Sequence, residues 1–194
     1  MSSRRFPGKV LAPFKGKPLI THVLERVSKA LPRAPITVLT SIETSDDPLF
    51  AYLASLNIDV FRGPLDNVYE RFSMCARGRD CKWLLRICAD SPLVDQNVLK
   101  QLASRIDEDW DIITTIFPRT FPRGNNGELI RTSTFLGVDA HALTEHEREH
   151  VTSVFYNHSE KYRILNIDSG DPKLAELNLC IDTIEDLRRL EAGQ

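Results

Sequence analysis

Apolar, β-branched runs alternate with segments of helical spacing along this chain, and the alternation predicts an α/β fold. The runs at residues 36–40, 58–61 and 82–89 indicate strands, and the last is almost entirely apolar, as in a strand buried on both faces. We therefore expect a mostly parallel sheet with helices on both faces. With 194 residues, the chain predicts a single domain over residues 1–194.

Four helices are expected in the first half of the chain. Pro18 suits the first turn of a helix, and apolar residues then recur at helical spacing. Asp46 and Asp47 should cap a second helix and Asp95 a fourth, because short acidic side chains accept hydrogen bonds from the free amides there. A third helix is expected at residues 66–76.

The second half should hold the remaining strands and helices. Apolar runs and turn residues predict strands at 111–116, 128–131, 162–167 and 177–181, a loop at 117–127, and helices near 133–141 and 144–157. Thr183 should begin the last helix, because Glu185 and Asp186 fall in its first turn, where the helix dipole favours acidic side chains.

Composition argues against several functional classes. A net charge of −2 and an isoelectric point near 6.2 disfavour a general nucleic-acid-binding protein, which carries a basic excess. The sequence has no run of about 20 apolar residues, so no membrane span is expected. Its four cysteines lack the two-residue spacing of zinc knuckles and redox motifs, which predicts reduced thiols in a cytoplasmic protein.

The chain opens on a basic stretch, residues 1–18, that proline and glycine punctuate too often for a regular element. Its spaced cations include Arg5, Lys9, Lys15 and Lys17. Fixed cations and free backbone amides suit a polyphosphate, although the spacing is not that of a Walker A loop. On composition alone, an ordinary basic tail explains the stretch equally well.

Two aspartates follow predicted strands. Asp90 comes after the strand at 82–89 and Asp182 after the strand at 177–181. Ligands of α/β sheets bind at the carboxyl ends of strands, so a basic loop and two such carboxylates suit magnesium-assisted phosphoryl or nucleotidyl transfer. Two structural roles stay open: Asp90 as a turn residue, and Asp182 as a helix cap in competition with Thr183.

The stretch "SSRRFPGKVLAPFKGKPLI" resembles the nucleotide-binding signature of the cytidylyltransferases. It is most similar to the branch of spore-coat polysaccharide biosynthesis protein F, which is related to acylneuraminate and CMP-Kdo synthetases. Further similar blocks follow in the family's order, over essentially the whole chain: "RGPLDNVYERF", "LLRICADSPLVD", "PRTFPRGNNGELI", "REHVT" and "LCIDTIEDL".

The resemblance implies a Rossmann-like nucleotidyltransferase fold and a homodimer, with a sugar-binding and dimerisation region at about 117–160. The implied reaction transfers CMP from CTP to a sugar or sugar acid and releases pyrophosphate, with Mg2+ as cofactor. Its setting would be the biosynthesis of surface polysaccharide, such as a spore coat, or of glycoconjugates.

The resemblance also implies roles for individual residues. Lys9, Arg5 and Asp90 would be catalytic, and Asp90 and Asp182 would hold the magnesium ion. The nucleotide would be bound by Ser2, Ser3, Arg5, Lys9, Lys17, Asp66, Asn67 and Asp90. The sugar or the partner subunit would face Arg123, Glu128, Arg148 and His150.

The sequence departs from the family's pattern in two places. Family members carry a first, central strand directly ahead of the stretch that here begins at Met1. We therefore expect a gap in the sheet beside residues 82–89, a collapse of the flanking strands, or a strand donated by another element. The segment "RGNNGELI" also lacks the bulkier residues of many relatives, so the identity of the acceptor stays open. A second functional class is then a non-catalytic nucleotide-binding relative.

The segment "HEREH", from His146 to His150, matches the zinc-peptidase pattern of two histidines one helical turn apart. The extended metzincin pattern needs glycine and histidine further on, where this chain has Ser153 and Tyr156. A solvated helix face explains His146 and Glu147 as well. A zinc peptidase is therefore a remote alternative, and we expect no zinc site here.

Overall fold

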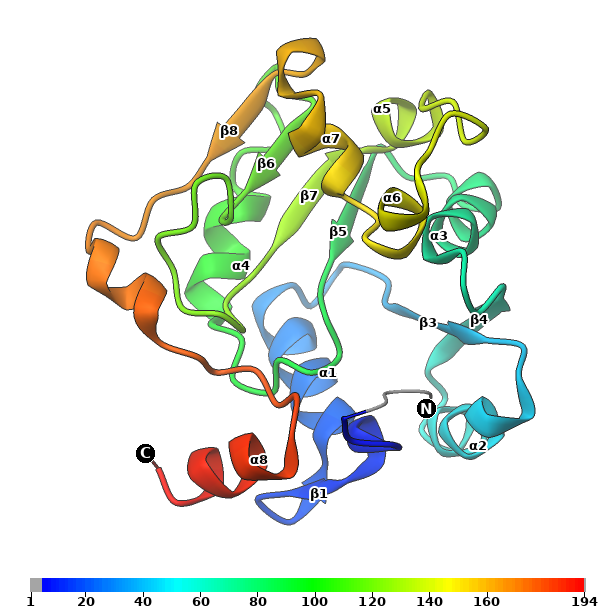
Figure 1. The fold of residues 1–194 in the computed structure, drawn as a ribbon, viewed down its shortest axis with the longest axis vertical. Coiled ribbons are helices and arrows are strands. Elements are labelled where there is room, and N and C mark those ends of the chain that lie inside the picture. Colours follow the sequence, from blue (N-terminus) through cyan, green and yellow to red (C-terminus); the bar gives the residue numbers. More distant parts are fainter. Residues whose placement is uncertain (1–4, 194) are drawn as a thin grey trace.

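The largest sheet has four strands in the order β5–β7–β6–β8 (Figure 1). The computed structural model describes residues 5–193. These strands are β5 (Trp83–Arg86), β6 (Ile112–Thr114), β7 (Glu128–Arg131) and β8 (Ile164–Asn166). β7 runs antiparallel to β5 and to β6, whereas β6 and β8 are parallel. The α/β class is confirmed, but β7 is antiparallel because the chain returns from β6 through a loop and not through a helical crossover.

Two smaller sheets accompany the first. β3 (Thr37–Ser41) and β4 (Asp59–Gly63) form a parallel pair, joined through the 3-10 helix η2 (Thr44–Asp46) and the helix α2 (Asp47–Ser55). The opening basic stretch, predicted as irregular, contains the 3-10 helix η1 (Lys9–Leu11) and a hairpin of β1 (Pro13–Phe14) and β2 (Lys17–Pro18). Lys15 and Gly16 both have positive φ in the hairpin turn, a conformation that glycine adopts without strain.

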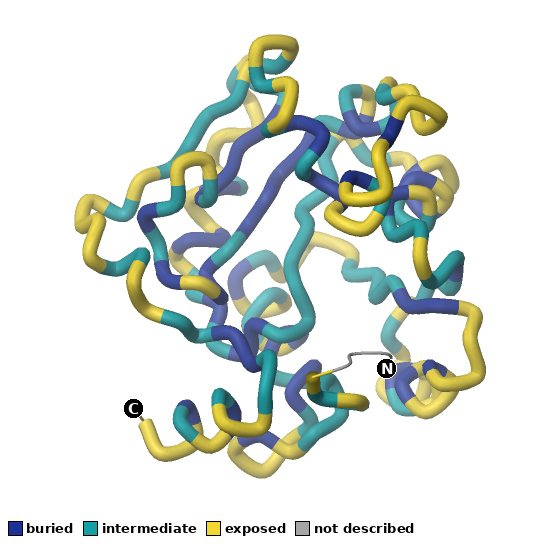
Figure 2. Tube along the Cα trace, in the orientation of Figure 1, coloured by how far each residue is buried: buried dark blue, intermediate teal, exposed yellow. Residues whose placement is uncertain are grey.

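Helices cover both faces of the four-stranded sheet. On one face, Ile113 and Leu129 pack against Leu102 of α4 (Gln96–Ala103). On the other face, their neighbours Ile112 and Ile130 pack in a cluster with residues of α3 (Val68–Arg77), α5 (Thr132–Leu136) and α7 (Ser153–Asn157). The short helix α6 (Glu145–Glu149) packs against α3. Adjacent strand residues point to opposite faces, so both faces of β6 and β7 are buried, as Figure 2 shows.

The first and last long helices pack beside the hairpin. α1 (Leu19–Ala30) contributes Leu19 and Val23 to a cluster with Phe14 of β1 and Leu187 of α8 (Ile184–Glu191). The 3-10 helices η3 (Ser159–Lys161) and η4 (Pro172–Glu176) lie on either side of β8 in the chain. Among residues 5–193, no helix is both long enough and apolar enough to span a membrane.

Two expectations about the second half of the chain are wrong in detail. Residues 177–181 form no strand, because their backbone amides bond to separate loops: Leu179 N–H donates to Arg123 O and Ile181 N–H to Asp90 O. The helix expected at 144–157 is two short helices, α6 and α7, and α5 is shorter than the expected 133–141. Helix α6 ends at His150, because the backbone of this residue leaves the helical conformation.

A gap separates the β3–β4 sheet from the four-stranded sheet. β3 pairs with β4 and β5 pairs with β7, and no hydrogen bond joins β3 to β5 in the described part of the chain. Of the three arrangements expected beside residues 82–89, the structure therefore has the first, an open gap.

Candidate active site

Asp90 and Asp182, far apart in the sequence, lie side by side. Asp90 follows β5 in a turn, and its backbone oxygen accepts a hydrogen bond of 2.9 Å from Ile181 N–H. This bond and the contact of Ser91 Oγ with Cys180 Sγ at 3.7 Å join the two loops and set Asp182 next to Asp90. The two aspartates therefore meet as expected, although residues 177–181 are not a strand.

Lys9 lies between the two carboxylates. Its ammonium group donates to Asp90 Oδ2 at 3.0 Å and to Asp182 Oδ1 at 2.8 Å. Burial lowers the pKa of Lys9, but the two carboxylates outweigh burial, so its pKa is raised from the ordinary value. At Asp182, burial acts to raise the pKa of the carboxyl group, but the hydrogen bond and charge of Lys9 act against it, and the pKa is lowered. Lys9 is therefore a fixed positive charge at neutral pH.

Two further cations approach the same aspartate. Arg5 lies 3.2 Å from Asp182 Oδ2, and Arg123 lies 4.0 Å from the same atom. Both side chains are largely exposed, at 67% and 59%. Three cations thus surround two carboxylates, which leaves an excess of positive charge that suits a polyanion.

A glycine allows the loop of Arg123 to approach the aspartate. Gly124 has φ +101°, and a Cβ atom there would lie 2.8 Å from the backbone carbon of Leu179. Any side chain would push the 117–127 loop away from residues 177–181. The pairing of Arg123 with Asp182 depends on this close backbone contact.

The side chain of Asp182 does not cap α8, a role that the sequence left open. Thr183 is the N-cap of α8, and its side chain forms a reciprocal capping box with Asp186. The side chain of Asp182 is therefore available to the cations. Asp90 Oδ1 accepts a hydrogen bond of 3.2 Å from Ser91 Oγ, so Asp90 has a turn contact as well as its contact with Lys9.

Other predicted nucleotide-binding residues lie apart from this cluster. Lys17 on β2 pairs at 2.5 Å with Glu25, and both side chains are about half exposed. Asn67 caps α3 by accepting a hydrogen bond from Glu70 N–H, and Asp66 is exposed beside it. Ser2 and Ser3 fall outside the described residues. Of the predicted set, the structure brings together Arg5, Lys9 and Asp90.

Glu128, predicted to face the substrate, is only 1% exposed. Its Oε2 accepts a hydrogen bond of 2.5 Å from Arg86, and its Oε1 accepts one of 2.8 Å from the Tyr156 hydroxyl. Thr114 Oγ1 lies 2.9 Å from that hydroxyl. Glu128 therefore belongs to a buried network beside Arg86, the last residue of β5, and both of its oxygens accept hydrogen bonds.

Arg148 and His150 lie on and just after α6, which packs against α3 (Figure 1). The rings of His146 and His150 are 4.4 Å apart, as the "HEREH" pattern requires. Glu147, however, is 4% exposed and accepts hydrogen bonds from Thr144 and Asn157. Among residues 5–193, no group of three or more metal-binding side chains is assembled.

Sequence reasoning missed Arg119, which lies in the same loop as Arg123. Arg119 donates a hydrogen bond to Asn126, and burial together with Arg123 lowers its pKa. The repeated "FPR" in "FPRTFPRG" is the signal that could have identified both arginines. Arg119 adds a second cation on this side of the site.

Thiol chemistry is not supported at the site. Burial raises the pKa of Cys180 to about 11, and burial also raises the pKa of Cys88. Thiols with raised pKa values stay protonated at neutral pH and are poor nucleophiles.

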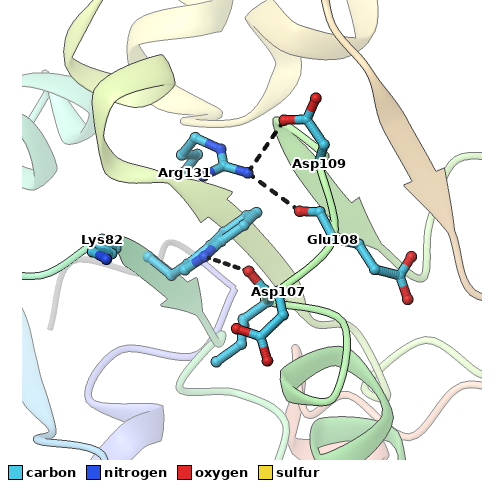
Figure 3. A pocket seen from close by; sticks show the side chains of 7 residues that line it. Lys82, Asp107, Glu108, Asp109 and Arg131 are labelled. Atoms are coloured by element: carbon cyan, nitrogen blue, oxygen red, sulfur yellow. Dashed lines mark hydrogen bonds and ion pairs between the residues drawn. The ribbon is translucent and has the colours of Figure 1, made fainter.

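A separate shallow pocket of about 430 Å³ lies at the opposite end of β5 (Figure 3). Arg131 lies over the Trp83 ring at 4.6 Å and donates to the backbone oxygen of Glu108. Asp109 lies 3.9 Å from the same guanidinium. Its Arg131 guanidinium is already engaged by Trp83, Glu108 and Asp109, so this pocket is a weaker candidate than the Lys9 cluster.

Comparison with known proteins extends the geometric result. A family model described as cytidylyltransferase matches residues 1–192. The spore coat polysaccharide biosynthesis protein SpsF of Bacillus subtilis is 28% identical, over 99% of this chain and 82% of that protein. An 8-amino-3,8-dideoxy-manno-octulosonate cytidylyltransferase of a Shewanella species is 33% identical, over 52% of this chain and 41% of that protein.

Solved structures agree with the fold. A cytidylyltransferase from Leptospira borgpetersenii superimposes with a TM-score of 0.92 at 27% identity, over 99% of this chain and 82% of that one. A CMP:2-keto-3-deoxy-manno-octonic acid synthetase solved with CTP superimposes with a TM-score of 0.69 at 14% identity, over 99% and 93% of the two chains. The second likeness shows the nucleotidyltransferase fold alone.

Proposed function

Since this chain belongs to the cytidylyltransferase family, we propose that it transfers CMP from CTP to a sugar or sugar acid and releases pyrophosphate. The contact of Lys9 with both Asp90 and Asp182 carries the proposal, because it sets an ammonium group and two carboxylates at one point. Nucleotidyl transfer builds negative charge on the leaving pyrophosphate, which Lys9 and Arg5 could stabilise while the two carboxylates hold a metal ion. The similarity to SpsF supports a role in polysaccharide biosynthesis.

Lys9 is the proposed partner of the leaving pyrophosphate. Its side chain is 15% exposed and is held by Asp90 and Asp182, and binding of an ion by these carboxylates would free its ammonium group for a phosphate oxygen. Arg5 is exposed and can turn from Asp182 to a phosphate oxygen, where a guanidinium can form two parallel hydrogen bonds.

Asp90 and Asp182 are the proposed magnesium ligands. Their oxygens lie 3.0 and 2.8 Å from the same nitrogen atom, so the two carboxylates already converge on one cation, and oxygen ligands are those that magnesium prefers. When bound, the ion would neutralise phosphate charge. Asp90→Asn should keep the fold, lose metal-dependent turnover and weaken binding of Mn2+ followed by its spin resonance. Unchanged Mn2+ binding in Asp90→Asn and in Asp182→Asn would contradict the assignment.

Arg123 is the proposed contact for the acceptor. A sugar acid carries a carboxylate, and the exposed Arg123 guanidinium at the edge of the site could bind it. We assign Glu128 to support of the sheet edge through Arg86, because both its oxygens are engaged. Contacts of Arg148 and His150 with the acceptor, and the homodimer, stay predictions.

The decisive experiment is a pyrophosphate-release screen. Each of the four nucleoside triphosphates is incubated with a panel of sugar acids and sugar phosphates, with and without Mg2+. We expect release with CTP and one acceptor class, and none when the acceptor is omitted. Equal release from all four triphosphates, or release without any acceptor, would contradict the proposal.

A second candidate function is nucleotide binding without catalysis. The observation that favours it is the gap beside β5, because Asp90 follows this strand and one edge of the strand is unpaired. Calorimetric titration separates the two: binding of CTP with no pyrophosphate release from any acceptor would support the second candidate.

A further inference from the structure

The 117–127 loop, which carries Arg119 and Arg123, lies between β6 and β7 (Figure 1). Its later part is held on both sides of Arg123: the Arg123 N–H donates to Leu177 O at 2.9 Å, and Leu179 N–H donates to Arg123 O at 2.7 Å. These bonds do not involve the start of the loop. An arginine on an untethered segment loses conformational freedom when it binds an anion, so a second tether would favour binding.

Asn166, the last residue of β8, supplies a tether at the start of the loop. Its Oδ1 accepts a hydrogen bond of 3.0 Å from Phe117 N–H, and its Nδ2 donates one of 2.9 Å to Pro118 O. An amide side chain suits this place because it carries an acceptor and a donor side by side. Asn166 is paired with Thr114 in the ladder of β6 and β8, so its side chain continues that pairing into the loop.

The neighbours of Asn166 are themselves well placed. Ile167 N–H donates to Thr114 O at 2.8 Å, so the backbone next to Asn166 belongs to the sheet. The Phe117 ring stacks on the Tyr156 ring, with 4.9 Å between their centroids. Phe117 is therefore held through its amide and through its ring.

A second contact from the segment after β8 holds the loop at Thr120. Ser169 N–H donates to Thr120 Oγ1 at 2.9 Å, and Ser169 Oγ donates to Thr120 O at 2.9 Å. Arg119 lies between Pro118 and Thr120, so its backbone is tethered on both sides. The end of β8 thus sets the position of Arg119, although the two segments are far apart in the sequence.

The charge of Arg119 is poorly compensated inside the protein. Its guanidinium is half-buried and donates to Asn126 of the same loop, and among residues 5–193 it has no ion pair. Burial and the charge of Arg123 both lower its pKa. A half-buried cation without a carboxylate partner suits an anionic group of a ligand.

We propose that Asn166 is a positioning residue for the acceptor side of the site: its two hydrogen bonds hold the start of the 117–127 loop, so that Arg119 and Arg123 are in place before the acceptor binds. This role rests on the proposed transfer reaction. Asn166 acts through the loop and not on a substrate, because its side-chain oxygen and nitrogen are both engaged by Phe117 and Pro118. Leucine has nearly the same shape and would lose both bonds.

The kinetic test compares Asn166→Leu with the parent chain in pyrophosphate release, with CTP and the acceptor that the screen selects. We expect the KM for the acceptor to rise about tenfold or more and the KM for CTP to stay within about twofold, because only the acceptor side loses its tether. Asn97→Leu, the same change at an exposed position of α4, is the control and should leave both KM values unchanged. An unchanged acceptor KM in Asn166→Leu, or an equal rise of both KM values, would overturn the proposal.

Hydrogen exchange shows whether the tether itself is lost. The Phe117 amide should exchange about tenfold or more faster in Asn166→Leu, because its N–H loses its acceptor. The Ile167 amide should be unchanged, which would show that β8 still pairs with β6. Equal exchange of Phe117 in the variant and the parent would also overturn the proposal. If Asn166→Leu does not fold, Ser169→Ala removes the bond to Thr120 O and should raise the acceptor KM in the same direction, by a smaller factor.

Failure of this role and failure of the transfer reaction give different results. If the parent chain releases no pyrophosphate with any acceptor, the transfer reaction is wrong, and the role of Asn166 in it is wrong as well. If the parent is active and neither Asn166→Leu nor Ser169→Ala raises the acceptor KM, the positioning role alone is wrong.

Discussion

Two ion clusters lie close together along β5, and they are built differently. Arg86, the last residue of β5, pairs with Glu128, which is 1% exposed and has both oxygens occupied. A few residues later, Asp90 and Asp182 share Lys9 and carry an exposed Arg5 at their rim. We call Arg86, Glu128 and Tyr156 the closed cluster, because Glu128 is buried with both oxygens occupied. We call Lys9, Asp90, Asp182, Arg5 and Arg123 the open cluster, because Arg5 and Arg123 are exposed to solvent.

The difference predicts that one cluster acts in stability and the other in chemistry. In the closed cluster, loss of Arg86 would leave the Glu128 carboxylate, which is 1% exposed, buried without a countercharge, which is costly. In the open cluster, cations exceed carboxylates and part of each group contacts water, so partners can be exchanged for a ligand at lower cost. We therefore expect substitutions in the first to change unfolding, and substitutions in the second to change turnover.

The largest effect is expected for Glu128→Gln. The substitution leaves the Arg86 guanidinium without its countercharge; breaking a buried pair costs about 3–5 kcal/mol, and the 24% exposure of Arg86 sets the expected cost at the lower end of that range. Urea unfolding should show this loss in the free energy of unfolding. Tyr156→Phe removes only the hydroxyl that donates to Glu128 and should cost about 1 kcal/mol.

An exposed pair provides the matched control. Arg105 and Glu108 lie 2.8 Å apart, with side chains 53% and 41% exposed. Glu108→Gln should change the free energy of unfolding by about 0–1 kcal/mol. If Glu128→Gln were as mild as Glu108→Gln, the closed cluster would not be a stability element, and the comparison would fail.

Lys9→Ala should act on turnover and not on the fold. A fixed donor at a developing charge contributes about 3 kcal/mol, so the pyrophosphate-release rate should fall roughly a hundredfold or more. The melting temperature should change little, because the loss of two ion pairs is partly offset by solvation of the freed carboxylates. Lys29→Ala, on the exposed face of α1, is the control for loss of one lysine. Near-normal turnover of Lys9→Ala would make the opening stretch an ordinary basic tail.

Local sequence signals predicted many elements of the fold. The strand at residues 128–131 and the helix start at Thr183 were both predicted at their observed positions. Strand alternation and capping depend on neighbours within a few residues, so the sequence contains the information directly. The shared site of Asp90 and Asp182 was also predicted, though with residues 177–181 wrongly assigned as a strand.

Long-range pairing was not predictable in the same way. Lys17 was expected to help Lys9 bind the nucleotide, but it pairs with Glu25 on the neighbouring helix. Glu128 was expected to face the sugar or the partner subunit, and only the pairing of β7 with β5 sets it opposite Arg86 inside the protein. Such partners come from tertiary packing, which neither periodicity nor composition records.

The smallest effect is expected in the acid response of the open cluster. Burial acts to raise the pKa of Asp182, but Lys9, Arg5 and Arg123 lower it below its ordinary value of 3.8. A carboxyl group with a lowered folded-state pKa stabilises the fold above its ordinary value, and this stabilisation is lost as pH falls through the lowered value. Asp182→Asn lacks this titration. Its deficit in free energy of unfolding should therefore be full at pH 6 and should shrink as the pH falls below about 4, by at most about 1.4 kcal/mol per pH unit. Urea unfolding at pH 6, 4 and 3 measures the difference between the two proteins. Parallel curves over this range would show that Asp182 is not held by the cations, and the open cluster would then lose its claim to bind a polyanion.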